Sequence, residues 1–382
     1  MDAIGLFLCG DVMTGRGIDQ ILATPGDPAL HEGYLESAEE YVALAEIRNG
    51  PIPRPVAESY VWGDAFAELD RVRPDLRIVN LETAVTLSDE WAPKGINYRM
   101  HPANVSCLTA AAIDCCVLAN NHVLDWGEPG LIETLETLER SGIRVAGAGR
   151  NRGAAEAPAV LPLRDNGRVL VFSMGMASSG VSPDWAAGAA RPGVDFLPDL
   201  SQRSVEGIAR RVEAVKRPGD VIVLSIHWGA NWGYEVADDE RAFAQALIDS
   251  AGVDLVHGHS SHHPKGIEIH RGRLILYGCG DFINDYEGIR GHEAFRGDLG
   301  LMYFPVLESG TGRLARLAMT ATQVKRFQVR RASGADARWL AAMLDREGRR
   351  LGTRSELLPD GRIELQWGPD GPGVRTSQRP SA

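Results

Sequence analysis

Short apolar segments alternate with amphipathic segments through the first two-thirds of this chain. The apolar runs have the length of buried strands, and they cover residues 4–9, 76–81, 114–119, 169–174, 221–226 and 253–257. The amphipathic runs between them predict helices at residues 62–72, 129–141, 201–215 and 239–250. This alternation indicates an α/β fold with a largely buried sheet.

From residue 266 onward the pattern changes to strands joined by short turns. Strands are predicted at residues 266–270, 274–277, 300–306, 314–321, 324–329 and 362–367, with a helix at 335–351. Such a run suggests antiparallel strands that complete a second sheet. Residues 24–60, rich in proline, glycine and charge, predict a long loop or lid beside a site, and residues 369–382 predict a disordered tail. No internal repeat is present, so a single domain over residues 1–368 is expected.

Charge and cysteine content narrow the partners and the compartment. The 382 residues carry a formal net charge of −11, which argues against a nucleic-acid partner or an anionic membrane. An anionic substrate remains compatible, because a bound metal reverses the local field. The apolar run at residues 4–9 is too short for a secretory signal or a membrane helix. The five cysteines have no CxxC spacing and are expected to be buried thiols, so the sequence predicts a cytoplasmic protein without membrane insertion.

Polar side chains of the types that bind metals follow several of the predicted strands. They are Asp11, Glu82, Asn121, His122, Asp125, His227, His259 and His262. In open α/β sheets, ligands bind outside the carboxyl ends of the strands. A single histidine after a strand is more often a structural residue, but the recurrence of such residues at successive strand ends predicts one shared divalent-metal site.

The order of these motifs resembles a known family. Asp11, Asn80-Leu81-Glu82, Asn121-His122, His227-Trp228-Gly229 and Gly258-His259 with His262 are similar to the CapA-type, poly-γ-glutamate capsule branch of the calcineurin-like metallophosphoesterases. The segments 119–149 and 274–287 carry the resemblance most specifically, and it covers residues 4–330. It implies a calcineurin-like metallophosphoesterase fold, a two-sheet β-sandwich flanked by helices, with metal at the strand ends.

The resemblance also implies roles for individual residues. Asp11 and His262 would serve one metal position, and Glu82 would lie near or between two positions. Asn121, His227 and His259 would serve the other position. His122 would act in acid/base chemistry or bind the transition state, with Asp125 orienting its imidazole.

The sequence departs from the family pattern in two places. Met13 stands where phosphoesterases place a second histidine, and a thioether is a poor ligand for a hard metal, which favours one tightly held ion and frees Asp11 to act as a base. Asp281 adds a carboxylate where the family usually has asparagine. Five residues are candidates for binding a peptide or a small anionic substrate: His263, Lys265, Asp281, Arg290 and His292.

Three reactions are compatible with this set. The first expectation is epimerisation, because the chain is similar to the metal-dependent epimerase of lasso-peptide biosynthesis, which inverts the Cα of a C-terminal tryptophan. Such chemistry needs a base and an acid at one carbon; Asp11 with His262, and His122 with Asp125, are the candidates, and Ca²⁺ would suit the oxygen ligands.

The alternatives are phosphoester hydrolysis with Mn²⁺, Fe²⁺ or Zn²⁺, in which His122 protonates the leaving group, and a helper function in poly-γ-glutamate or capsule biosynthesis. The missing histidine at position 13 speaks against the first alternative, and the absent membrane anchor speaks against the second. The identity and number of the metal ions, the substrate and the oligomeric state are left open by the sequence.

Overall fold

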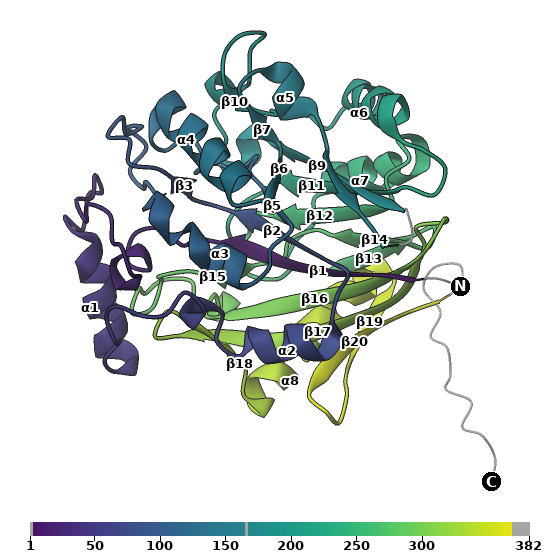
Figure 1. Cartoon of the computed structure of the whole chain (residues 1–382). Coiled ribbons are helices and arrows are strands. Elements are labelled where there is room, and N and C mark those ends of the chain that lie inside the picture. The colour runs from purple at the N-terminus through teal and green to yellow at the C-terminus, as the bar shows by residue number, and fades with distance from the viewer. Residues whose placement is uncertain (1–2, 165–166, 369–382) are drawn as a thin grey trace.

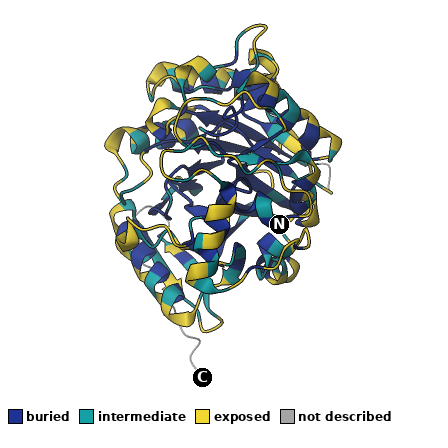
Figure 2. Cartoon of the chain, turned by 90° about the vertical axis from the view of Figure 1, so that its left-hand side faces the viewer, coloured by how far each residue is buried: buried dark blue, intermediate teal, exposed yellow. Residues whose placement is uncertain are grey.

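Two β-sheets face each other in the computed structural model of the chain, which describes residues 3–164 and 167–368. Strand β1 (Ala3–Val12) crosses the middle of the molecule and lies inside the larger sheet (Figure 1). Buried residues gather on the strands in the interior, and exposed residues lie on the outer faces of the surrounding helices (Figure 2). The predicted tail, residues 369–382, lies outside the described residues.

The larger sheet has ten strands and combines a parallel half with an antiparallel half. Its parallel strands are β1, β2 (Leu76–Leu81), β5 (Cys115–Val117) and β6 (Arg144–Ala146), with β15 (Asp281–Ile283) also parallel to the end of β1. Its antiparallel strands are β16 (Leu299–Glu308), β17 (Leu314–Lys325), β18 (Gln328–Arg331), β19 (Thr353–Leu357) and β20 (Arg362–Trp367). Because β16 pairs with β1, the two halves form one continuous sheet.

The smaller sheet has six strands in the order β13-β14-β12-β11-β9-β8. They are β8 (Ala159–Pro162), β9 (Arg168–Gly175), β11 (Val221–His227), β12 (Leu255–His259), β13 (Ile267–His270) and β14 (Arg273–Leu276). Its four central strands are parallel, and the edge strands β8 and β13 are antiparallel. Two further two-stranded ladders join β3 (Ala84–Val85) to β4 (Arg99–Met100) and β7 (Ala148–Gly149) to β10 (Gly193–Val194).

Helices pack against both sheets. They are α1 (Ala38–Asn49), α2 (Ala65–Val72), α3 (Ser106–Ala110), α4 (Gly127–Arg140), α5 (Arg152–Glu156), α6 (Gln202–Val215), α7 (Asp238–Ser250) and α8 (Gly334–Gly348). Apolar residues of α1, α2, α3 and α4 share a core with one face of the larger sheet, and those of α6 and α7 share a core with one face of the smaller sheet. Among the described residues, no helix has both the length and the apolar composition needed to cross a bilayer.

The strict alternation of side chains along the strands builds the core between the sheets. Leu6 and Leu8 of β1 pack with Val221 and Val223 of β11, whereas Phe7 of β1 faces the helices on the other side. Because both faces of each sheet are covered, the strands are apolar on both sides, and this explains why they are readable in the sequence as continuous apolar runs. The observed architecture is therefore an α/β, two-sheet sandwich flanked by helices.

An irregularity at the end of β1 sets the position of Asp11. The pairing of β1 with β2 shifts register between Leu8 and Asp11, and β15 lies so close that a Cβ added at Gly10 would fall 1.5 Å from the carbonyl oxygen of Gly280. The backbone N–H of Asp11 donates to that carbonyl at 2.9 Å. Bulges of this kind often re-aim a side chain next to a functional site.

Three of the predictions need correction. The segment 24–60 is not wholly irregular, because Ser37 and Glu40 form a capping box that begins α1 at Ala38. The early parallel strands are divided between the two sheets. The later antiparallel strands do not build a second sheet of their own: β16 to β20 extend the sheet that contains β1, while β13 and β14 join the smaller sheet.

The close approach of β15 to β1 predicts that position 10 tolerates only glycine. The Gly10→Ala variant should lose at least about 2 kcal/mol of unfolding free energy, because the added methyl group meets backbone and not a movable side chain. Gly33→Ala is the matched control, because nothing lies within 4 Å of a Cβ at that exposed position. Chemical denaturation of both variants measures the difference; equal stabilities would contradict the tight β1–β15 contact.

Candidate metal centre

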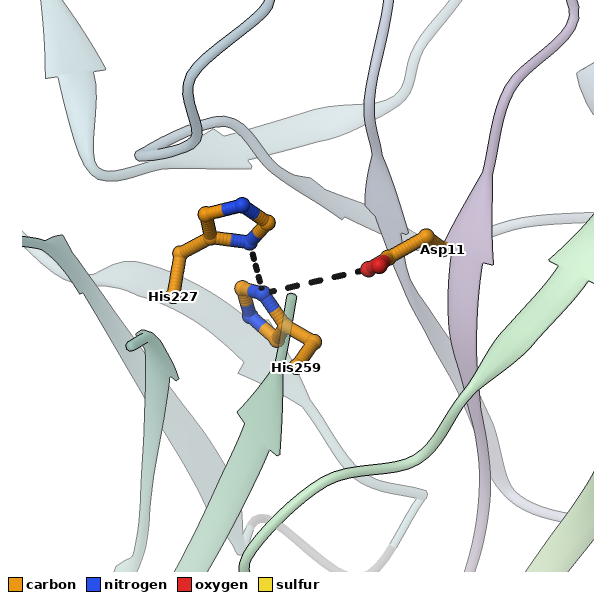
Figure 3. Close-up of side chains that lie close together, drawn as sticks. All are labelled: Asp11, His227 and His259. Atoms are coloured by element: carbon orange, nitrogen blue, oxygen red, sulfur yellow. Dashed lines mark hydrogen bonds and ion pairs between the residues drawn. The ribbon is translucent and has the colours of Figure 1, made fainter. Parts of the chain in front are cut away.

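Three side chains of metal-binding type converge where β1, β11 and β12 end. Asp11, His227 and His259 are buried, and each offers a polar atom within 4.8 Å of the others. Nδ1 of His259 lies 2.7 Å from Nδ1 of His227 and 4.0 Å from Oδ1 of Asp11 (Figure 3). The parallel register of β11 and β12 places the two histidines side by side, and β1 of the other sheet brings the carboxylate. The site therefore spans both sheets.

Asp11 also belongs to a second group of this kind, with His262 and Asp281. Asp281 lies opposite Asp11 in the β1–β15 pairing, and Nδ1 of His262 lies 2.8 Å from Oδ1 of Asp281. Met13 supplies no oxygen or nitrogen ligand; its sulfur accepts a hydrogen bond from the hydroxyl of Tyr286 at 3.4 Å. Asp281 thus adds a carboxylate to the group that Met13 leaves short of a ligand.

The carboxylates of the site repel one another. Nδ2 of Asn80 donates to Oδ1 of Asp11 at 2.7 Å and to Oε2 of Glu82 at 3.4 Å, which holds these two acids side by side. Burial, followed by the charge of Asp281, raises the pKa of Asp11 to about 7. Burial and the charge of Asp11 raise the pKa of Glu82 well above its ordinary value. A cation at this position would remove the repulsion, because nearby opposite charge favours the ionised form of each acid.

The imidazoles of His227 and His259 are held in the neutral form by burial. Burial lowers the pKa of His227 and of His259 well below the ordinary value, and it lowers the pKa of His257 to about 4. Oδ1 of Asn121 lies 3.0 Å from Nε2 of His227, and in the metal-free protein one of the two Nδ1 atoms of His227 and His259 carries the proton of the 2.7 Å hydrogen bond between them. Neutral imidazole nitrogens next to buried carboxylates form a donor set that fits a divalent metal ion.

A histidine–carboxylate pair lies at the edge of the centre. Nδ1 of His122 lies 2.6 Å from Oδ2 of Asp125, and Nε2 of His122 lies 3.8 Å from Oε1 of Glu82. Burial lowers the pKa of His122 to about 4, against the opposing effect of Asp125. Lys94 donates to Oδ1 of Asp125 at 2.7 Å and to the carbonyl oxygen of Asn121. The proton on Nδ1 is directed at Asp125, so the lone pair of Nε2 points toward the metal-type ligands.

A cavity of about 720 Å³ opens beside the second ligand group, and His262 lines it. Its volume is in the range of small-molecule sites. Three of its lining cations, Arg48, Arg290 and Lys325, form no ion pair with any residue in the described ranges. Trp232 also lines the cavity, and its ring stacks on that of His292 at 4.1 Å. The cavity combines unpaired positive charge with an aromatic surface.

Comparison with known proteins identifies the family. The sequence profile described as "Bacterial capsule synthesis protein PGA_cap" matches residues 5–286, which is most of the chain. The chain belongs to this family. A protein of Mycobacterium tuberculosis named as a probable polyglutamine synthesis accessory protein is 48% identical over 366 residues, which cover 95% of this chain and 96% of that protein.

More distant relatives carry related names. The PGA biosynthesis protein CapA of Bacillus subtilis is 26% identical over 320 residues, covering 82% of this chain and 70% of that protein. The capsule biosynthesis protein CapA of Bacillus anthracis is 25% identical over 239 residues, covering 62% of this chain and 55% of that protein. These names refer to polyglutamine synthesis, PGA biosynthesis and capsule biosynthesis, and the resemblance to CapA proteins is confirmed.

In this PGA_cap protein the predicted metal ligands come together. Asp11, His227 and His259 form one group, and Asn121 and Glu82 contact His227, at 3.0 Å and 3.7 Å. The grouping differs from the prediction in one respect: Asp11 is common to both groups, where Glu82 was expected to lie between the two positions. Asp281, expected to contact substrate, is buried among the ligand-type residues.

The structure places two of the predicted substrate-binding residues, His263 and Lys265, in buried positions away from the surface. His263 is fully buried, accepts a hydrogen bond from the backbone of Gly233 at 3.1 Å and packs against Phe295. Lys265 is buried beneath the same loop, and its ammonium donates to the carbonyl oxygen of Glu235 at 3.3 Å. Both side chains stabilise the loop after β11, because their polar atoms are already paired. Arg290 and His292, by contrast, line the cavity, and their contact with substrate stays a prediction.

Several residues of the centre were missed by sequence reasoning. Lys94 lies in an irregular segment, and nothing in its neighbours signals that it meets Asp125. Asn80 and Asn120 bond to each other at 3.0 Å and hold the loops of the site together, and both adjoin motifs that could have suggested this role. Ser225, inside the apolar run that forms β11, gave a further readable signal, a polar residue in an otherwise apolar strand.

The raised pKa of Asp11 predicts a pH dependence of stability. In metal-free protein the unfolding free energy should fall as pH rises from about 4 to about 7, because the folded state retains a proton that the unfolded chain has already released. The Asp11→Asn variant lacks this titration, so its unfolding free energy should fall less steeply with pH. The two slopes should differ by up to about 1.4 kcal/mol per pH unit. Urea unfolding in EDTA across this range gives both slopes. Identical slopes in the two proteins would show that Asp11 is not perturbed.

Proposed function

We propose that this chain has a calcineurin-like metallophosphoesterase fold and is a divalent-metal-dependent hydrolase acting on a glutamate-containing polymer or its precursor. The observation that carries the proposal is the position of Asp11, whose carboxylate is common to two groups of metal-type ligands. Asp11 would help to hold a divalent ion in either group, with His227 and His259 in one and with His262 and Asp281 in the other, and divalent ions would supply chemistry used in hydrolysis.

The departure at Met13 does not weaken this proposal. Asp281, held opposite Asp11 by the β1–β15 pairing, offers a carboxylate in the group where Met13 offers none. With it, that group has three candidate ligands, Asp11, His262 and Asp281, which is the number that catalytic metal sites commonly use. When bound, the ions would supply Lewis-acid polarisation and lower the pKa of water.

The residues of the chain itself supply proton transfer. His122 directs its Nδ1 proton at Asp125 and its Nε2 toward Glu82, so Nε2 is placed to exchange a proton with a substrate in the centre. Lys94 holds Asp125 from the other side at 2.7 Å and keeps the pair in place. The roles of His122 as the acid/base group and of Asp125 as its orienting partner are part of this proposal.

The substrate class follows from the cavity and from the relatives. Arg48, Arg290 and Lys325 offer unpaired positive charge next to His262, which suits side chains or a terminus bearing carboxylates. Relatives that match most of this chain are named for polyglutamine synthesis and for PGA biosynthesis. A glutamate-containing chain would bring carboxylates to this cavity, and the names of the relatives point to the synthesis of a polymer.

Epimerisation of a peptide residue is the second candidate, and one observation favours it. The centre contains two separate imidazole–carboxylate pairs, His122 with Asp125 at 2.6 Å and His262 with Asp281 at 2.8 Å. Ion pairing with Asp281 raises the pKa of His262 although burial opposes its charged form, whereas the pKa of His122 is lowered. One protonated and one neutral imidazole are what removal and return of a proton at a Cα would need.

One assay distinguishes these reactions. The purified protein, loaded with Mn²⁺ or with Ca²⁺, is incubated with α- and γ-linked glutamate oligomers and with an aryl phosphate, in D₂O and in H₂¹⁸O. Hydrolysis is expected to appear as metal-dependent cleavage with ¹⁸O in one product. Deuterium at a Cα without cleavage would identify an epimerase instead. Neither signal with any substrate would contradict an enzymatic role.

The role of His122 makes a separate prediction. His122→Ala should lower kcat by about 10²- to 10⁴-fold, the usual contribution of a positioned acid/base group, while the metal content is unchanged. His270→Ala is the matched control, because it breaks a comparable contact, 2.9 Å from His270 Nε2 to Asp249 Oδ1, on a hairpin of the smaller sheet. Full activity in the His122 variant would exclude the acid/base assignment.

A further inference from the structure

A chain of hydrogen bonds runs behind His259, on the side away from Asp11. Nε2 of His257 lies 2.8 Å from the carbonyl oxygen of Cys9, and Nδ1 of His257 lies 3.1 Å from Oγ of Ser225. Oγ of Ser225 lies 2.7 Å from Nε2 of His259. All four residues are buried with no exposed surface, so solvent does not compete for these contacts.

The carbonyl oxygen at one end fixes the direction of every bond in the chain. A carbonyl only accepts, so Nε2 of His257 carries a proton and, in the neutral ring, Nδ1 does not. The hydroxyl of Ser225 must then donate to Nδ1 of His257, which leaves its oxygen to accept. The donor to that oxygen is Nε2 of His259. A neutral His259 with its proton on Nε2 has an unprotonated Nδ1.

We propose that Ser225 and His257 are positioning residues that hold His259 in the tautomer whose unprotonated Nδ1 faces Asp11 and His227. The proposal rests on the metal-binding part of the proposed function, not on the reaction. Partners behind a ligating histidine commonly fix its tautomer and orientation in this way. Here the partner is a hydroxyl whose own direction is fixed by a second histidine and a backbone carbonyl.

The buried polar atoms of Ser225 and His257 all have hydrogen-bond partners. Ser225 and His257 are cross-strand neighbours in the β11–β12 register, two positions before the pair His227 and His259 and so on the same face of the sheet. His257 also reaches from the smaller sheet to the backbone of β1 in the larger sheet. Burying such groups costs free energy unless all are paired, and these are paired end to end. Ser173, which lies beside Ser225 on β9, is equally buried, and its hydroxyl has no hydrogen-bond partner among the described residues.

The first test reads the tautomer without any metal or substrate. In metal-free, ¹⁵N-histidine-labelled full-length protein, long-range ¹H–¹⁵N correlations report which ring nitrogen of each histidine is protonated. The resonances of His259 are assigned from their loss in His259→Asn. We expect both His257 and His259 to be protonated on Nε2. A proton on Nδ1 of His259 in the wild-type protein would overturn the proposal.

The second test asks whether the hydrogen-bonded chain Cys9–His257–Ser225–His259, here called the relay, affects metal binding. Ser225→Ala and His257→Phe should each weaken Mn²⁺ or Zn²⁺ binding about 10- to 100-fold by calorimetry, the usual effect of removing a partner of a ligating histidine. Ser173→Ala removes a hydroxyl from the neighbouring strand and should leave the affinity unchanged. In His257→Phe the freed hydroxyl of Ser225 can turn to Nε2 of His259, so the spectrum should show the proton moved to Nδ1.

The outcomes separate the relay from the proposed function. If the wild-type protein binds no divalent ion, the metal-dependent function fails, and the tautomer in the first test still decides whether the relay exists. If the wild-type protein binds metal and both relay variants bind it equally well, the relay is overturned while the metal centre stands. Thermal unfolding of each variant, compared with Ser173→Ala, identifies any loss of affinity that comes from misfolding.

Discussion

The candidate metal centre holds several buried carboxylates close together, and their mutual repulsion is the constraint on which the site depends. Asp11, Glu82 and Asp281 are all buried at the ends of strands, and burial together with mutual repulsion raises the pKa of Asp11 and of Glu82. A protein gains no stability from such an arrangement without a compensating cation. Neutral imidazoles from the opposite sheet face the same point. The divalent metal proposed for this centre would account for both features.

The two-sheet architecture makes this convergence possible. The larger sheet supplies the carboxylates from β1, β2 and β15, and the smaller sheet supplies the imidazoles from β11 and β12. His257 bonds to the backbone of β1 and so fixes the two sheets relative to each other next to the centre. Ligand geometry and sheet packing are therefore coupled, and changes in the core between the sheets should alter metal binding as well as stability.

Much of the fold could be predicted from the sequence, because buried parallel strands leave continuous apolar runs. The run at residues 76–81 coincides with β2 and that at 362–367 with β20. The division of the strands between two sheets was not readable, because strand pairing depends on contacts between distant segments. The same reason explains the placement of His263 and Lys265. Their residue types suit an anion, but each bonds to a backbone group 30 residues earlier in the sequence, at Gly233 and Glu235, so only the folded chain shows that they are buried.

The PGA_cap family match spans residues 5–286 and so contains all the residues of the candidate metal centre. The central claim is the shared carboxylate of Asp11. Anomalous diffraction from crystals grown with Mn²⁺ tests it most directly. Two peaks about 3.5–4 Å apart, both adjacent to the Asp11 carboxylate, are predicted. A structure without a peak at Asp11, or with manganese bound only elsewhere, would contradict it.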